Sequence, residues 1–212
     1  ITVAMGRGAR AGVLFRDAAA LERLSQIDTL VIDKTGTLTL GRARVATIVS
    51  AEGIDEPELL SVAASLERNS EHPLAEAILD AARERGHAAP ACSDFRSEPG
   101  AGVRGRVAGL SAALGSEAWL ASQGVAIEGL EEEAATLRAR GESVVFVSRG
   151  TRLLGLLGVA DPLREGAAEL LAALRSEGVR VFMATGDHPD TARAVARALG
   201  IQELRAQLSP EG

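Results

Sequence analysis

A short apolar run that ends in an aspartate constrains the fold of this chain more than any other feature. Residues Thr29 to Ile32 are apolar or β-branched, as in a buried strand, and they lead directly to Asp33. A loop rich in hydroxyl side chains, with Gly36 inside it, follows at once. Ligands of open α/β sheets bind at the carboxyl ends of the strands. We therefore expect Asp33 to lie at the ligand-binding edge of such a sheet.

The last third of the chain continues the α/β pattern. Strands are expected over residues 144–148, 153–159, 179–184 and 203–208, and helices over 164–177 and 189–199. Pro189 suits the first turn of a helix, and Gly178 and Gly200 suit helix ends. Strands that alternate with helices predict a parallel sheet with helices on its faces.

The stretch from about residue 43 to 148 departs from this alternation. Helices are expected over 56–68, 73–86 and 130–140, and short strands over 102–107 and 110–114. Helices and hairpins in this arrangement predict a separate α+β domain. It is inserted after the first strand of the parallel sheet.

Composition excludes several classes of function. The chain is 46% hydrophobic with a net charge of −6, a composition typical of soluble globular proteins, and its acidic balance argues against nucleic acid as a partner. No apolar run approaches the roughly 20 residues that a membrane helix needs. The single cysteine, Cys92, permits no internal disulfide and belongs to no metal-ligand cluster.

The chemistry of an aspartate in this position suggests phosphoryl transfer. A carboxylate can attack a phosphoryl group and form an aspartyl phosphate. Because the transition state spreads negative charge over three oxygens, the site needs Mg²⁺ and hydrogen-bond donors. Thr37 and the amides around Gly36 can donate, and Thr185 and Gly186, at the end of another expected strand, can reach the same phosphate.

Two neighbours of Asp33 refine this hypothesis. Aspartyl-nucleophile phosphatases carry a second aspartate two residues on as general acid and base, and Thr35 cannot take that role. Phosphorylation by ATP can still proceed because ADP is a good leaving group, whereas hydrolysis of the phosphoenzyme slows. Lys34 is the only lysine in a chain whose other 22 Lys and Arg residues are all arginine, which indicates a need for a compact ammonium. The sequence leaves open whether Lys34 faces phosphate or a carboxylate.

These residues resemble a known family. Asp33-Lys34-Thr35-Gly36-Thr37 matches the phosphorylation signature of P-type ATPases, whose catalytic domain belongs to the haloacid dehalogenase superfamily. Thr185-Gly186-Asp187 and Asp161-Pro162 match two further family motifs in the expected order. The resemblance implies an α/β, haloacid-dehalogenase-like parallel-sheet phosphorylation domain with an inserted α+β nucleotide-binding domain. It also implies ATP and Mg²⁺ as cofactors, the metal lying at Asp33 and Thr35. Asp187 is expected to act beside the phosphate and Asp161 to shape the hinge, although both could simply cap helices.

The inserted domain resembles that of heavy-metal-transporting (type IB) P-type ATPases. Ser70-Glu71-His72-Pro73-Leu74 is similar to a motif of that branch, in which the histidine orients the adenine. Glu67 matches an adenine-contacting glutamate, and Gly100 and Gly102 match a nucleotide-binding glycine pair. The structural alternatives are a helix start at His72 and a hairpin turn at the glycines.

The opening residues 6–15 resemble the segment after a metal-carrying membrane helix and look closest to copper(I) exporters, with zinc or cadmium exporters as the alternative. The expected protein is an ATP-hydrolysing cation translocase. This part would be cytoplasmic, attached to an integral protein of the bacterial inner membrane. Its partners are ATP and the transmembrane and actuator domains, and the transported heavy metal binds outside the chain. A soluble phosphatase and a non-catalytic nucleotide sensor are further alternatives, and a potassium-pumping P-type ATPase is a nearer one, against which the Ser-Glu-His-Pro segment speaks.

The expected organisation has four parts: residues 1–20 after a membrane helix, 21–42 and 149–212 as the two pieces of the phosphorylation domain, and 43–148 as the nucleotide-binding domain. Both ends look cut, and we expect the phosphorylation domain to be incomplete at its C-terminus. A family lysine at the phosphate and a magnesium-binding aspartate are expected beyond residue 212. The isolated piece should therefore bind nucleotide but be catalytically impaired.

Overall fold

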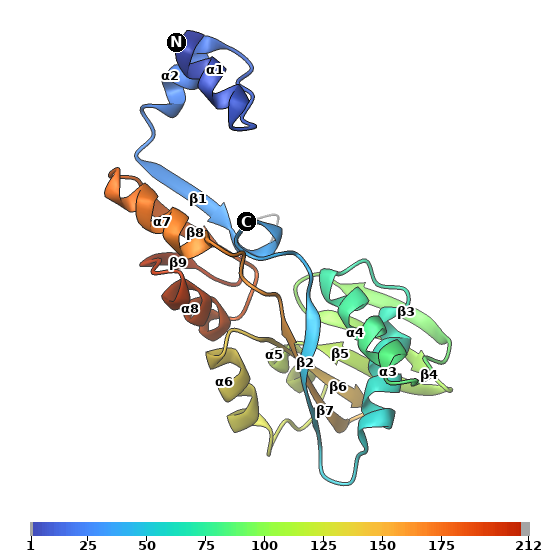
Figure 1. Ribbon diagram of the computed structural model, residues 1–212. Coiled ribbons are helices and arrows are strands. Elements are labelled where there is room, and N and C mark those ends of the chain that lie inside the picture. The colour runs from blue at the N-terminus through green and yellow to red at the C-terminus, as the bar shows by residue number, and fades with distance from the viewer. Residues whose placement is uncertain (1, 209–212) are drawn as a thin grey trace.

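A small parallel sheet carries Asp33. The computed structural model describes residues 2–208, and its three-stranded parallel sheet has the order β1-β8-β9 (Figure 1). The strands are β1 (Thr29–Asp33), β8 (Arg180–Ala184) and β9 (Glu203–Arg205). Asp33 pairs with Ala184 in the register of β1 and β8. The loops that follow these two strands therefore emerge side by side.

A larger antiparallel sheet forms the inserted domain. Its six strands have the order β2-β7-β6-β5-β4-β3. Their bounds are β2 (Arg44–Ser50), β3 (Cys92–Glu98), β4 (Gly102–Val107), β5 (Leu110–Gly115), β6 (Ser143–Arg149) and β7 (Arg152–Ala160). The expected strands over 102–107 and 110–114 are confirmed as the β4–β5 hairpin, whereas β2 and β3 were not predicted.

The sequence placed the segment that became β7 in the phosphorylation domain, and that prediction was wrong, whereas the segment that became β6 lay inside the expected inserted domain. The two strands pair antiparallel with each other, and β7 also pairs with β2. Only two residues, Gly150 and Thr151, connect β6 to β7. So short a link can join antiparallel neighbours only, because a parallel pair needs a crossover of a dozen or more residues. The expected boundary between residues 148 and 149 thus falls inside a hairpin, and β7 lies with the inserted sheet.

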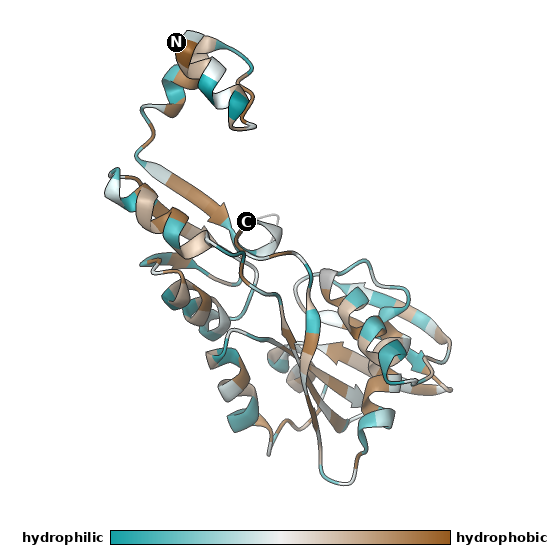
Figure 2. Cartoon of the chain, in the orientation of Figure 1, coloured by the Kyte–Doolittle hydropathy of each residue, from teal (hydrophilic) through white to brown (hydrophobic). Residues whose placement is uncertain are grey.

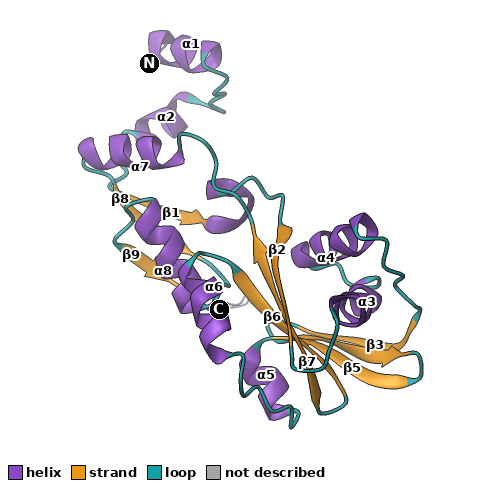
Figure 3. Ribbon diagram, turned by 60° about the horizontal axis from the view of Figure 1, so that its bottom comes forward, coloured by secondary structure: helices purple, strands orange, loops and turns teal. Residues whose placement is uncertain are grey.

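Helices cover both faces of the six-stranded sheet (Figure 3). On one face lie α3 (Glu56–Glu67) and α4 (Pro73–Glu84), and on the other α5 (Glu117–Ser122) and α6 (Glu131–Ala139). Each face has its own apolar core. Leu59 and Ile78 are fully buried in the first, and Leu120 and Phe146 in the second.

The parallel sheet packs against α7 (Ala167–Ser176) and α8 (Pro189–Ala198). Met183 of β8 and Ala192 of α8 are fully buried there. Hydrophobic residues dominate β1 and the central strands of the larger sheet, while the helices also carry hydrophilic residues (Figure 2). Near the N-terminus, α1 (Thr2–Arg10) and α2 (Ala18–Leu24) contain no buried residue. Among residues 2–208, no helix has the length and apolar character needed to cross a bilayer.

The chain passes between the two sheets twice, and the two crossing segments bind each other. The Leu40 N–H donates to the Pro162 carbonyl (2.9 Å), and the Arg164 N–H donates to the Leu38 carbonyl (2.9 Å). These two connecting segments, paired by a short antiparallel contact, are the covalent link between the domains, and we call them the hinge.

The close approach of β4 to β5 predicts the effect of one substitution. A Cβ on Gly102 would lie 2.6 Å from Gly115 Cα and 2.8 Å from the Trp119 ring. Overpacking of this kind should lower the free energy of unfolding by about 2 kcal/mol in Gly102→Ala. The matched control is Gly6→Ala in α1, where nothing lies within 4 Å. Urea unfolding would check both, and an unchanged stability of Gly102→Ala would contradict this packing.

Candidate active site

Asp33 ends β1 with an exposed side chain. Within residues 2–208 its carboxylate makes no hydrogen bond or ion pair. The carboxylate is therefore accessible to a ligand, and its role as a nucleophile stays a prediction. Thr35 and Thr37, in the loop that follows, are also exposed.

The loop after Asp33 is a wide turn over Lys34–Leu38, closed by the Thr39 N–H donating to the Lys34 carbonyl (3.2 Å). Gly36 has a φ of 73°, a left-handed conformation that costs a glycine little. Its N–H points inward and donates to Thr39 Oγ1 (3.0 Å). The Gly36 amide is thus engaged by the turn itself.

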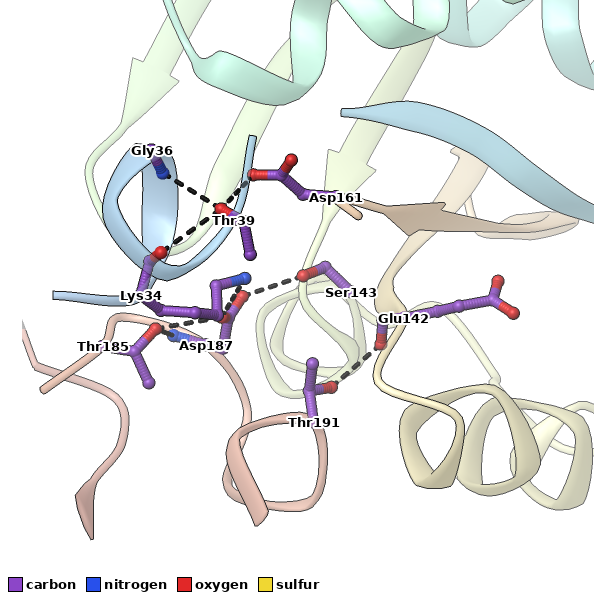
Figure 4. Close-up of polar contacts among 9 residues, drawn as sticks. All are labelled: Lys34, Gly36, Thr39, Glu142, Ser143, Asp161, Thr185, Asp187 and Thr191. Atoms are coloured by element: carbon purple, nitrogen blue, oxygen red, sulfur yellow. Dashed lines mark hydrogen bonds and ion pairs between the residues drawn. The ribbon is translucent and has the colours of Figure 1, made fainter. Parts of the chain in front are cut away.

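Lys34 faces a carboxylate, which answers the question that the sequence left open. Its ammonium lies 2.5 Å from Asp187 Oδ2, and the two side chains are only 7% and 16% exposed (Figure 4). The same carboxylate accepts hydrogen bonds from Thr185 Oγ1 (2.9 Å) and Ser143 Oγ (2.8 Å). Three donors therefore hold Asp187 beside the end of β1.

The pKa of Asp187 follows from these contacts. Burial alone would raise it, but the Lys34 charge and the hydrogen bonds from Lys34, Ser143 and Thr185 outweigh burial and lower it. Asp187 is thus a carboxylate at neutral pH. Its expected place beside the phosphate loop agrees with its contact to Lys34.

Asp161 holds the loop after Asp33 in place. Its carboxylate accepts from the Thr39 hydroxyl (2.6 Å) and from the Arg42 N–H (3.0 Å). From the same segment, Arg164 donates to the carbonyls of Thr37 (3.0 Å) and Gly36 (2.8 Å). The segment that leads from β7 back to the parallel sheet, with Asp161 and Arg164, therefore fixes the shape of the loop after Asp33.

Glu67, the expected adenine contact, is buried at the end of α3, with 2% of its surface exposed. Burial raises its pKa, and the nearby Ser70 hydroxyl acts in the opposite direction. Its Oε2 atom has no hydrogen-bond partner among the described residues. An unpaired buried carboxylate oxygen is costly, and a ligand that donates a hydrogen bond would satisfy it. Because this oxygen is itself buried, a donor such as the adenine amino group could reach it only after a local shift of the surrounding residues.

His72 caps α4: its Nδ1 accepts from the Leu74 N–H (3.2 Å). Burial lowers the pKa of His72, against the opposing effect of the Asp187 charge. His188, also followed by proline, caps α8 in the same way through Asp190. His72 therefore starts a helix, as the structural alternative supposed. Its Nε2 atom remains free to contact a ligand.

The glycine pair has two different environments. Gly100 lies in the turn between β3 and β4 with a φ of 72° and open space around it. Gly102 is packed against β5 and Trp119. Only Gly100 offers backbone that a ligand could approach at its Cα, and Gly102 is required by packing within the sheet.

The fit of Mg²⁺ rests on two residues. In the described part of the chain, no three His, Cys, Asp or Glu residues form a group that could hold a metal. Mg²⁺ commonly uses one or two protein carboxylates together with phosphate oxygens and waters. The free carboxylate of Asp33, with an oxygen of Thr35, fits that limited protein share.

Comparison with known proteins agrees with this geometry. The model of the haloacid dehalogenase-like hydrolases matches residues 27–211. The chain belongs to this family. Within it, the chain is 48% identical over all 212 residues to a copper-transporting P-type ATPase of Rhizobium leguminosarum bv. viciae. It is 43% identical over its whole length to a silver-exporting P-type ATPase of Salmonella typhimurium. It spans about a quarter of the length of these relatives, 25% and 26%.

Two solved structures share the architecture of this haloacid dehalogenase-like chain. The catalytic domain of the CPx-ATPase CopB-B has a TM-score of 0.72 and 26% identity, covering 98% of this chain and 71% of that one. A zinc-transporting PIB-type ATPase has a TM-score of 0.69 and 36% identity, covering 100% of this chain and 34% of that one. The predicted fold class and the resemblance to type IB P-type ATPases are confirmed.

Sequence reasoning missed Ser143 and Arg164. Ser143 lies 44 residues before Asp187, and a serine at the start of a strand carries no signal of such a contact. Arg164 lies two residues after Asp161-Pro162, so its closeness to a family motif could have drawn attention to it.

The buried ion pair predicts a large effect of its removal. Lys34→Met leaves the Asp187 charge unpaired and should lower the free energy of unfolding by about 3 kcal/mol. Because folding lowers the pKa of Asp187, its contribution is present above the unfolded value of 3.8 and is lost as the pH falls through the lower folded value. That acid dependence should shrink in Lys34→Met.

The control is Arg83→Gln, which breaks an exposed pair with Asp80 and should change stability by less than about 0.5 kcal/mol. Urea unfolding between pH 3 and pH 7 compares the variants. Equal stability of Lys34→Met and the parent chain would contradict the pairing.

Proposed function

We propose that this chain is the nucleotide-binding and phosphorylation region of a metal-exporting P-type ATPase, in which Asp33 accepts a phosphoryl group from Mg-ATP. The observation that carries the proposal is the free, exposed carboxylate of Asp33 beside the buried Lys34–Asp187 pair. The full-length ATPases to which the chain is similar support it.

The phosphoryl step follows from the site. A carboxylate oxygen of Asp33 attacks the γ-phosphorus, the bond from that phosphorus to the β–γ bridging oxygen breaks, and ADP leaves with the electron pair. No proton needs to move. Mg²⁺, when bound, supplies charge neutralisation at the phosphate oxygens. Lys34, held by Asp187, places a positive charge next to the nucleophile.

Hydrolysis of the aspartyl phosphate is the slow half of the proposed cycle. Thr35 has no acid–base group to activate water. A long-lived phosphoenzyme suits a transporter that changes conformation between two half-reactions, and it argues against a simple phosphatase.

Nucleotide binding is assigned to the inserted domain. Once a local shift exposes its unpaired Oε2, Glu67 would accept from the adenine amino group, and His72 would meet the base with the Nε2 side of its ring. Gly100 would allow close backbone approach. The charge of Asp187 acts on the pKa of His72, which supports a nucleotide site near the phosphorylation loop.

The proposed cargo is copper(I), because proteins named as copper and silver transporters match the whole chain at 43–48% identity. A zinc exporter is the second candidate, supported by the structural match to a zinc-transporting ATPase. The complete protein would be embedded in the bacterial inner membrane, with this region cytoplasmic and in contact with its transmembrane and actuator parts.

A phosphorylation assay of the complete ATPase tests the central claim. Asp33→Asn should abolish formation of an acid-stable, hydroxylamine-sensitive phosphoprotein from γ-labelled ATP, because the amide cannot attack phosphorus. The control Asp28→Asn, an exposed aspartate just before β1, should label normally. Undiminished labelling of Asp33→Asn would overturn the assignment.

A pair of histidine variants tests nucleotide binding by the isolated chain. His72→Ala and His188→Ala each remove a helix cap and should lose about 1 kcal/mol of stability. Only His72→Ala should also weaken ADP binding, by about tenfold. Calorimetric titration gives both affinities, and equal affinities would contradict the adenine contact.

The lowered pKa of His72 gives this contact a pH dependence. The lowered pKa keeps the imidazole neutral at pH 7, so nucleotide affinity should hold on acidification until the pH falls through the folded pKa, which lies below the ordinary value of 6.5. The same chain should show little steady-state ATP hydrolysis, since its described residues offer Mg²⁺ only Asp33 and Thr35. Robust ATP hydrolysis by the isolated chain would contradict the proposal that it is catalytically impaired.

A further inference from the structure

A second contact joins the two sheets, away from the covalent hinge. The turn between α6 and β6, residues 140–142, and Ser143 at the start of β6 lie against the first part of α8 (Figure 4). The fully buried Thr191 hydroxyl donates to the Glu142 carbonyl (2.9 Å). One residue on, Ser143 Oγ donates to Asp187 Oδ1 (2.8 Å). Two hydrogen bonds thus connect the inserted domain to the phosphorylation domain here.

The two oxygens of Asp187 serve different parts of the molecule. Oδ2 pairs with the Lys34 ammonium and accepts a hydrogen bond from Thr185, and both residues belong to the parallel-sheet domain. Oδ1 accepts a hydrogen bond from Ser143, which belongs to the six-stranded sheet. The donor set around the carboxylate is therefore completed across the domain boundary.

We propose that Ser143 is a positioning residue, which makes the Lys34–Asp187 pair sensitive to the relative orientation of the two domains. In the orientation seen here Ser143 fixes the Asp187 carboxylate, and through it the ammonium of Lys34 next to Asp33. If the domains turn about the hinge at residues 39–43 and 160–164, the bonds from Ser143 and Thr191 break. Asp187 then loses one of its three donors and can reorient, which loosens the lysine.

This role differs from simple packing, because the contact involves a charged acceptor. A hydrogen bond to a charged group contributes more than one between neutral groups. Donors to a carboxylate also lower its pKa. The pKa of Asp187 should therefore be lower when the two domains are in contact than when they are apart.

The strand β6 supplies a matched control. Ser148 is fully buried, and its Oγ has no hydrogen-bond partner among the described residues. Ser148→Ala removes the same atom from the same strand without removing a contact between the domains. Ser143→Thr keeps the hydroxyl and serves as the conservative variant.

Domain orientation can be measured in the chain itself by single-molecule energy transfer. Dyes would be placed at Glu84→Cys in α4 and Glu177→Cys after α7, both exposed, in a Cys92→Ser background. Ser143→Ala should raise the ratio of separated to closed molecules by about tenfold. Thr191→Val should act in the same direction. Ser148→Ala and Ser143→Thr should match the parent. A Ser143→Ala distribution identical to that of the parent overturns the proposal.

Carbon-detected NMR of the Asp187 carboxyl provides the second readout. Loss of the Ser143 donor should move its midpoint to higher pH, and Ser143→Thr should restore it. A midpoint unaffected by Ser143→Ala would show that the serine does not act on the carboxylate, which overturns the proposal even if the domains separate.

The final measurement rests on the proposed function. In the complete ATPase, Ser143→Ala should slow phosphoenzyme formation several-fold with little change in the KM for ATP, because Ser143 acts on the phosphorylation loop. If Asp33→Asn still labels, the proposed function fails while the energy-transfer and NMR results stand. If Asp33→Asn abolishes labelling and Ser143→Ala labels at the parental rate, the positioning role fails alone.

Discussion

The ion pair between Lys34 and Asp187 is the interaction on which the site depends. It joins the loops after two neighbouring parallel strands, at the edge where Asp33 is exposed. A pair this buried is stable only when further hydrogen bonds satisfy its remaining groups. Thr185 and Ser143 supply them on the carboxylate side. The only lysine of the chain is thus the cation of this buried pair.

A second network shapes the nucleophile loop from the opposite side. Asp161 and Arg164, on the segment returning from the inserted domain, bind the signature turn through Thr39 and two carbonyls. The same residues pair with the outgoing segment at the hinge. Asp161 and Arg164 therefore hold both the loop after Asp33 and the connection between the domains. A change in hinge conformation would also change the shape of that loop.

Helix capping and nucleotide binding coincide at His72. Its Nδ1 satisfies an N–H at the start of α4, as His188 does for α8. A histidine engaged at one nitrogen has a fixed ring orientation and one free edge. The same feature explains why sequence alone could not separate a structural from a binding role: both make the same use of His72-Pro73. Buried glutamates with an unpaired carboxylate oxygen lie near both caps: Glu67 is five residues before His72, and Glu142 contacts Thr191 of α8.

The sequence by itself determined the elements whose signals are local. The strand ending at Asp33, the α8 helix started by Pro189, the β4–β5 hairpin and the family motifs were all recognisable, because each depends on residues close together in the chain. Only the tertiary structure decided that β7 joins the inserted sheet, that Lys34 faces Asp187 and that Ser143 reaches the same carboxylate. These partners lie 44 to 153 residues apart in the Ser143 and Lys34 contacts with Asp187. No periodicity or propensity reports which side chains meet over such distances, since that depends on how the two sheets pack.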